Sequence, residues 1–78
     1  MLITLRPIGH LKELFPGNRE RLELELSGTW TIKNIVTENF DVSPDSISAI
    51  VIKGKHRKWD YEPKDGDEIL LIPPLGGG

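Results

Sequence analysis

The end of the chain holds the residues with the most distinctive chemistry. An apolar run at positions 69–72 leads into two prolines, a leucine and three glycines, so the Gly78 carboxylate ends a segment with little side-chain bulk. Glycine has no Cβ and adopts backbone angles closed to other residues, which suits a segment that must enter a narrow channel. Nearly extended, residues 74–78 reach roughly 17 Å at about 3.3 to 3.6 Å per residue. The residues that we expect to form this flexible tail are Pro74, Leu75, Gly76, Gly77 and Gly78.

A glycine-rich end can also be a frayed terminus or a linker, because chain ends are disordered unless something holds them. Here the glycines follow an apolar run without a serine-rich spacer, and no residue follows Gly78 in the sequence. Both details favour a functional arm. We therefore expect the Gly78 carboxylate to react inside the active site of another protein.

The length and composition are those of one small globular domain. The 78 residues include 37% hydrophobic and 28% charged residues. A domain of this size buries only about 60% of its unfolded surface, which leaves little room for an internal catalytic cavity. This favours a binding or carrier module over an enzyme with an active site of its own. The expected division is a folded domain at 1–73 and the tail at 74–78.

Charge, hydropathy and cysteine content argue against several classes of partner and site. A net charge of −2 creates no overall field that attracts nucleic acid or anionic lipid. No apolar run approaches the roughly 20 residues that span a bilayer, and no signal segment opens the chain. We therefore expect a cytoplasmic protein with neither a nucleic-acid nor a membrane partner. The absence of cysteine excludes disulfides, thiolate metal sites and thiol catalysis.

Hydrophobic periodicity predicts the elements that must position the tail. Apolar and polar residues alternate in 1–6 and 21–26, which indicates two strands with one core face each. Between them, residues 11–15 form an apolar stretch as long as one helical turn. After Thr31, a candidate N-cap, the apolar period lengthens to about 3.6 residues and predicts a helix that ends near Asp41. The apolar face of this helix comprises Ile32, Ile35, Val36 and Phe40.

The second half of the chain predicts three more strands. Residues 48–53 and 55–59 flank Lys53-Gly54, a dipeptide that suits the tight turn of a hairpin. A loop rich in turn residues, 63–67, precedes a last strand at 68–72. Pro73 ends this strand, because proline cannot donate a hydrogen bond to a ladder.

Together these elements resemble the ubiquitin-like sulfur carriers, which include the small subunit of molybdopterin synthase and the thiamine-pathway sulfur carrier. The similarity covers the whole chain and is greatest to the molybdopterin synthase small subunit. It rests on the element order, on the loop Lys64-Asp65-Gly66-Asp67-Glu68 and on the ending Pro73-Pro74-Leu75-Gly76-Gly77-Gly78. The resemblance implies an α+β fold of the β-grasp (ubiquitin-like) type, in which a mixed sheet of four to five strands packs on one helix.

The resemblance also implies a reaction cycle. An adenylyltransferase similar to ubiquitin-activating enzymes uses ATP to adenylate the Gly78 carboxylate, and a persulfide sulfur then displaces AMP. The resulting thiocarboxylate donates its sulfur to a pterin precursor in the large subunit of molybdopterin synthase, or to an equivalent acceptor. In this cycle the chain itself binds no cofactor and no metal, and it serves as the sulfur-donating subunit of a synthase complex. The absence of cysteine is consistent with sulfur carried on the acyl terminus.

Strand parity predicts a docking surface beside the tail. If Ile69 faces the helix, then Leu70 and Ile72 point outward. Val51 lies on the same outer face if Ile50 belongs to the core. Exposed aliphatic residues are common and often have no role. Because the resemblance predicts a patch in this place, we expect Val51, Leu70 and Ile72 to dock a partner.

The other residues that could do chemistry have plainer explanations. The basic run at 53–58 is expected to be a solvated turn, with docking to an acidic protein second and RNA binding third. Trp59 and Tyr61 are expected to pack on the core rather than stack on bases. The acidic residues of 65–68 lack the remaining ligands of a calcium loop, so we expect them to form a turn. His10 and His56 have no partner in sequence and are assigned no role.

Two classes of function remain open from the sequence. The first is a thiocarboxylate carrier that serves molybdenum-cofactor synthesis, thiamine synthesis or tRNA thiolation. The second is a ubiquitin-like modifier that Gly78 joins to a lysine of a target, or a module that only docks. Both the carrier and the modifier need an activating enzyme and a free glycine terminus.

Overall fold

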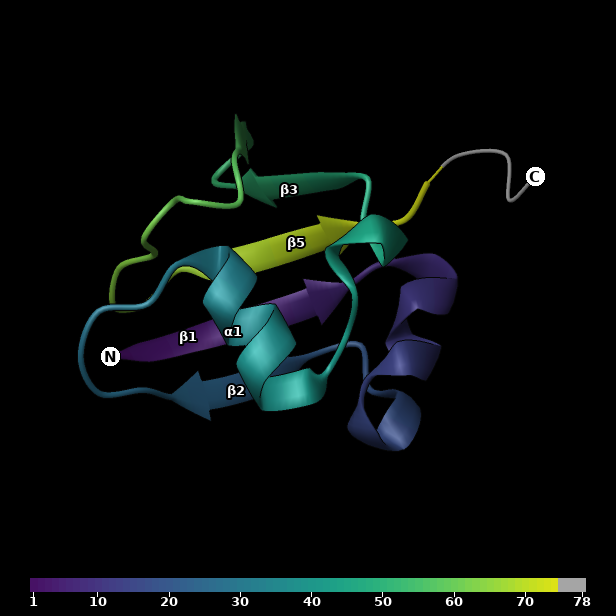
Figure 1. Ribbon diagram of the computed structural model, residues 1–78, viewed down its shortest axis with the longest axis horizontal. Coiled ribbons are helices and arrows are strands. Elements are labelled where there is room, and N and C mark those ends of the chain that lie inside the picture. The colour runs from purple at the N-terminus through teal and green to yellow at the C-terminus, as the bar shows by residue number, and fades with distance from the viewer. Residues whose placement is uncertain (75–78) are drawn as a thin grey trace.

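Residues 1–74 are described by the computed structural model, in which one face of a sheet is covered by a helix (Figure 1). The sheet has the order β2-β1-β5-β3-β4. β1 and β5 are parallel and the other neighbours are antiparallel, so the sheet is mixed. The first and last strands therefore lie side by side in its middle. The strands are β1 Leu2–Pro7, β2 Leu22–Glu25, β3 Ala49–Ile52, β4 Lys55–Arg57 and β5 Glu68–Ile72.

The α-helix of the described residues, α1 Ile32–Phe40, begins and ends where the sequence predicts. Thr31 is its N-cap, since Thr31 Oγ1 accepts a hydrogen bond from Asn34 N at 3.2 Å. At the other end Asp41 adopts the left-handed conformation, with φ of 54°. A left-handed residue turns the backbone out of the helix, which explains why α1 ends there.

Loop carbonyls satisfy two further amide groups of the first turn of α1. Ile32 N donates to Tyr61 O at 3.0 Å, and Lys33 N donates to Trp59 O at 3.1 Å. These groups have no partner within a helix. The chain thus leaves the sheet after Arg57 to cap α1, and β4 is shorter than the strand predicted over 55–59.

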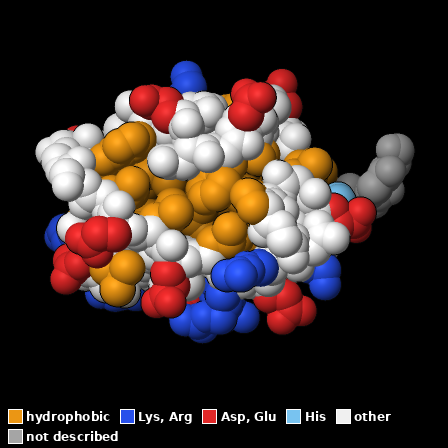
Figure 2. All heavy atoms as spheres, turned by 90° about the horizontal axis from the view of Figure 1, so that it is seen from below, with side chains coloured by type: hydrophobic (Ala, Val, Ile, Leu, Met, Phe, Trp, Pro, Cys, Tyr) orange, Lys and Arg blue, Asp and Glu red, His pale blue; other side chains and the backbone are white. Residues whose placement is uncertain are grey.

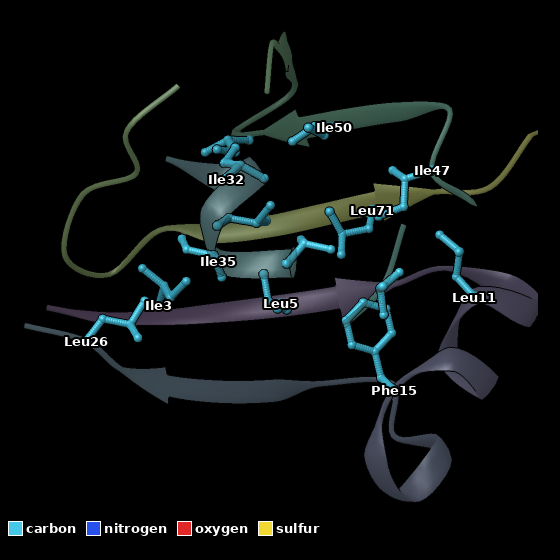
Figure 3. Close-up of a cluster of buried hydrophobic side chains, with 14 residues drawn as sticks. Ile3, Leu5, Leu11, Phe15, Leu26, Ile32, Ile35, Ile47, Ile50 and Leu71 are labelled. Carbon is cyan, nitrogen blue, oxygen red and sulfur yellow. The ribbon is translucent and has the colours of Figure 1, made fainter. Parts of the chain in front are cut away.

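The hydrophobic core lies between α1 and the sheet (Figure 3). Ile32, Ile35 and Val36 of α1 are fully buried, as are Ile69 and Leu71 of β5. The predicted helix face and the period-two pattern of the last strand are both confirmed. β5 has a neighbouring strand on each side and core packing on one face, so it is held more tightly than the edge strands.

The hairpin turn at Lys53-Gly54 is confirmed. Its two residues have φ of 54° and 77°, and a type I′ turn requires positive φ at both positions. Ile52 accordingly lies opposite Lys55 in the ladder.

Short 3₁₀ segments connect the main elements. The turn predicted at 11–15 is the 3₁₀ segment η1 Gly9–Leu14, followed by η2 Pro16–Asn18, and η3 Pro44–Ser46 follows α1. Phe15, between η1 and η2, is buried. Its ring packs edge-on against the ring of Phe40, with 5.1 Å between the ring centroids. This aromatic pair fixes the η1–η2 segment to the end of α1.

The burial of β2 differs from its prediction. Leu22 and Leu24 were expected to form a core face, yet both are only half-buried. The reason is position, because β2 is an edge strand that pairs with β1 alone among the described residues. The alternation in the sequence identifies which side chains of a strand point toward the core. It does not show whether the strand lies at the edge of the sheet, where those side chains are only partly covered.

Candidate functional site

The end of β5, which carries the predicted tail, is fixed by hydrogen bonds on both sides. Ser48 N donates to Ile72 O at 2.7 Å, and Ile8 N donates to Leu71 O at 2.9 Å. The backbone of β5 is therefore hydrogen-bonded to its neighbours as far as Ile72, the last residue of the strand. This end of β5 lies at the opposite end of the sheet from the N-terminus (Figure 1).

Two prolines follow β5. Pro73 is half-buried and lies near Gly9, where an added Cβ would stand 3.9 Å from Pro73 Cγ. Pro74 is exposed. Neither proline has an N–H, so the ladder ends at Ile72. Of the predicted tail, Pro74 lies on the surface as expected, whereas Leu75, Gly76, Gly77 and Gly78 lie outside the described residues.

The structure brings the three predicted docking residues together on the face of the sheet that is turned away from α1. Val51 lies directly opposite Leu70, and Ile72 lies opposite Ala49 in the same ladder. Val51, Leu70 and Ile72 are half-buried, whereas their inward neighbours in the two strands are buried. The predicted strand faces are therefore confirmed. We call these three residues the outer-face patch; that it docks a partner stays a prediction.

Polar residues flank the outer-face patch on both sides. Arg6 lies opposite Leu70 on one side, and His56 lies opposite Val51 on the other, so a row of four residues crosses the sheet. A shallow hollow of about 540 Å³ lies over this part of the sheet. It is lined by Arg6, Val51, Lys53, Gly54, Gly66, Glu68 and Leu70. The arrangement suits an apolar side chain of a partner with polar groups around it.

An ion-pair cluster forms one side of this hollow. Glu68 Oε1 lies 3.1 Å from Arg6 Nη1, and Glu68 Oε2 lies 3.4 Å from Arg21 Nη1. The three side chains are about half exposed, so the cluster contributes little to stability and mainly holds the arginines in place. The sequence alone does not reveal this cluster, because Arg6 and Glu68 are 62 residues apart. Only the register between β1 and β5 brings them together.

The acidic loop before β5 is a turn, as predicted. Asp65 Oδ1 accepts a hydrogen bond from Leu2 N at 2.7 Å, and Asp67 Oδ2 accepts one from Lys64 N at 2.8 Å. Asp67 is buried and its backbone carbonyl accepts from Thr4 N at 2.9 Å. Over residues 1–74, no group of three acidic or histidine side chains is placed to hold a metal ion. These aspartates instead fix the loop and hence the start of β5.

The basic hairpin is solvated and its aromatic neighbours pack on the core. Lys55, His56 and Lys58 are exposed. The guanidinium carbon of Arg57 lies 4.6 Å from the centroid of the Tyr61 ring. Tyr61 and Trp59 both pack against the core. Both predictions are confirmed.

The described helices are too short or too polar to cross a membrane.

Comparisons with known proteins identify the fold. No protein-family model and no curated protein sequence matches the chain. Among solved structures, SAMP1, the small archaeal modifier protein 1 of Haloferax volcanii, has a TM-score of 0.74 and 14% identity over 100% of both chains. A chain in the complex of subunits 1 and 2 of the molybdopterin-converting factor from Helicobacter pylori has a TM-score of 0.62 and 22% identity over 100% of both chains.

A ubiquitin of Caldiarchaeum subterraneum is also similar, with a TM-score of 0.64 and 26% identity over 100% of this chain and 98% of that one. These neighbours are ubiquitin-like β-grasp proteins. The chain has the same fold, a mixed five-stranded sheet with one α-helix among its described residues. The α+β, β-grasp architecture implied by the sequence resemblance is confirmed.

Proposed function

We propose that this protein is a sulfur carrier whose Gly78 carboxylate is adenylated and then converted to a thiocarboxylate, most specifically for molybdopterin synthesis. The observation that carries the proposal is the way β5 ends. A strand bonded on both sides supplies two of the three residues of the outer-face patch and stops at Pro73 and the exposed Pro74. A rigid body that ends in this way suits a tail that must reach into a partner docked on the same face.

The proposed chemistry takes place on the last carbonyl of the chain. The Gly78 carboxylate attacks the α-phosphorus of ATP and releases pyrophosphate, which leaves an acyl adenylate. A persulfide sulfur of a donor protein attacks the carbonyl carbon and AMP leaves. A thiol then attacks the donor's sulfur in this acyl disulfide, so that a new disulfide forms on the donor and Gly78 leaves as a thiocarboxylate. This scheme needs no acid, base or thiol from the chain, which has no cysteine.

Two partners follow from the proposed chemistry. One is an adenylyltransferase of the ubiquitin-activating type, which binds ATP. The other is a sulfur acceptor, for which we propose the large subunit of molybdopterin synthase, because the Helicobacter pylori neighbour was solved as a complex of two subunits of the molybdopterin-converting factor. The cycle is proposed to run in the cytoplasm. Thiamine synthesis and tRNA thiolation are alternative destinations for the same sulfur.

A second candidate function is protein modification through Gly78. The similarity to SAMP1 and to a ubiquitin favours it, since the names of those neighbours describe modifiers. The two functions share activation and differ in the nucleophile that attacks the acyl adenylate. A persulfide gives a thiocarboxylate, whereas a lysine amine gives an isopeptide bond.

The shared step is tested by ATP–pyrophosphate exchange. The activating enzyme of the same organism is mixed with ATP and labelled pyrophosphate, with and without this protein. We expect label to enter ATP only when the protein is present, because exchange requires reversible adenylation of Gly78. Exchange that is equally fast without the protein, or absent in its presence, contradicts both candidate functions.

Replacement of Leu70 by glutamate is expected to weaken partner binding and to lower stability only slightly. Leu70 lies in the centre of the outer-face patch and is half-buried, so its replacement should lower the free energy of unfolding by only about 1 kcal/mol. Calorimetric titration with the activating enzyme measures the first effect and thermal unfolding the second. Leu14→Glu is the matched control, because Leu14 is an exposed leucine of η1 outside the sheet. Equal binding of both variants contradicts docking on this patch.

A further inference from the structure

The outer edge of β2 is open. Among residues 1–74, β2 pairs with β1 and no strand lies on its other side. Figure 2 looks onto this edge of the molecule and shows an apolar strip between the helix layer and the sheet. Leu22 and Leu24 of β2 are half-buried and pack against the margin of the core. An edge strand with an apolar margin is a template for pairing with another strand.

The hydrogen-bond pattern of β2 shows which residues face the open edge. Leu26 N donates to Met1 O at 2.8 Å, and Met1 N donates to Leu26 O at 2.9 Å. Bonded and non-bonded pairs alternate along an antiparallel ladder. The even-numbered residues of β2 therefore turn their backbone groups toward β1. Arg21, Glu23 and Glu25 turn theirs toward the open edge.

The side chains along this edge carry charges that complement one another in an antiparallel pair. Residues 19–25 read Arg-Glu-Arg-Leu-Glu-Leu-Glu. By pairing about Leu22 we mean a two-fold pairing in which Leu22 lies opposite Leu22 of a second copy. It places Arg21 opposite Glu23 twice. Both side chains are exposed.

Other registers bring like charges together. Pairing about Glu23 places Arg21 opposite Glu25 but also Glu23 opposite its own copy, and pairing about Leu24 places Glu23 opposite Glu25. Like charges directly opposite each other destabilise a strand pair, whereas opposite charges stabilise it. A shift by one residue would place inward-facing side chains opposite outward-facing ones. Charge and pleat together select the register about Leu22.

We propose that β2 pairs antiparallel with β2 of a second copy about Leu22, which joins the two five-stranded sheets into one. In this register Arg21 and Glu23 of the second copy exchange backbone hydrogen bonds, in agreement with the pattern of the free edge. The two-fold axis stands perpendicular to the sheet, so both α1 helices lie on one face and the two apolar strips meet. β5 lies two strands from the edge, so its end and the outer-face patch stay uncovered. The dimer is therefore compatible with the proposed function and independent of it.

Sedimentation velocity of the isolated chain tests the pairing, over concentrations from about 10 μM to about 1 mM, the range expected for a small interface. We expect a reversible shift from the monomer mass of 8.8 kDa toward twice that value. The association should weaken in about 1 M salt, where the Debye length is about 3 Å.

Charge exchange tests the register. Glu23→Arg places an arginine opposite Arg21 and should weaken dimerisation at least about tenfold, with a circular dichroism spectrum like that of the parent chain. The double variant Arg21→Glu/Glu23→Arg restores opposite charges across the strand pair. It also removes the half-exposed ion pair between Arg21 and Glu68, which contributes little to stability, so dimerisation should recover. Pairing about Glu23 predicts no such recovery, because the glutamate introduced at position 21 would then face Glu25. Glu62→Arg, an exposed residue of the loop between β4 and β5, makes the same change in net charge and should have no effect.

A chain that stays monomeric over the whole concentration range overturns the proposal, even if an extended peptide of another protein adds to the same edge. A dimer that Glu23→Arg leaves intact, or that the double variant does not recover, also overturns it, since the contact then lies elsewhere or in another register.

Discussion

Deletion of Gly78 is expected to abolish ATP–pyrophosphate exchange by the activating enzyme while the melting temperature stays unchanged. The deletion retracts the carboxylate by about 3.3 to 3.6 Å. Reacting atoms must approach within about 3 to 3.5 Å, and a misplacement of about 1 Å can cost about a hundredfold in rate. A carboxylate displaced by a whole residue should therefore give no measurable adenylation. The folded body should be unaffected, because the core residues within 1–74 all precede Pro73.

Substitutions at Gly77 provide the matched series for this experiment. Gly77→Trp keeps the length of the tail and adds bulk, so we expect it to lose exchange, whereas Gly77→Ala should retain part of it. Unchanged exchange in the deletion variant and in Gly77→Trp contradicts the proposed role of the tail. A fall in melting temperature would instead indicate that the tail packs on the body.

Replacement of Leu71 by alanine is expected to lower the free energy of unfolding by about 2 to 5 kcal/mol, the usual cost of a Leu-to-Ala change in a core. Leu71 is fully buried in the strand at the centre of the sheet and packs among the residues shown in Figure 3. A small domain has a total stability of about 5 to 15 kcal/mol, so this loss is a large fraction of it. Urea unfolding followed by circular dichroism measures the change.

Leu70→Ala is the control for this experiment, because it makes the same chemical change at the neighbouring position. Leu70 is half-buried on the outer face, so its substitution should cost about 1 kcal/mol or less. Equal losses at positions 70 and 71 would mean that both faces of β5 are covered to the same degree. The outer face would then not be free for a partner.

The positions of the main elements could be predicted because local patterns determine them. Alternation of apolar residues located β5 at its observed bounds, and the change of period after Thr31 located α1 with its N-cap. Positive φ at Lys53 and Gly54 followed from the turn type that a two-residue hairpin needs. Strand parity placed Val51, Leu70 and Ile72 on one face without knowledge of the sheet order.

Features that depend on contacts distant in sequence could not be predicted. The pairing of β1 with β5 brings Arg6 to Glu68, and no local pattern specifies that register. The alternation in β2 does not reveal that β2 is an edge strand, so the half-burial of Leu22 and Leu24 was missed. The early end of β4 depends on two carbonyls that bond to the first turn of α1, a contact between loop and helix.

The most direct measurement of the central claim is the intact mass of the protein recovered from its own host, with fragmentation of its last peptide. We expect a fraction of the protein to be heavier by the difference between one sulfur and one oxygen atom, with the change located on Gly78. Conjugates to other proteins through Gly78, without the sulfur form, would assign the modifier function instead. A terminus that carries neither sulfur nor a conjugate, under conditions in which the cell makes sulfur-containing cofactors, contradicts the account.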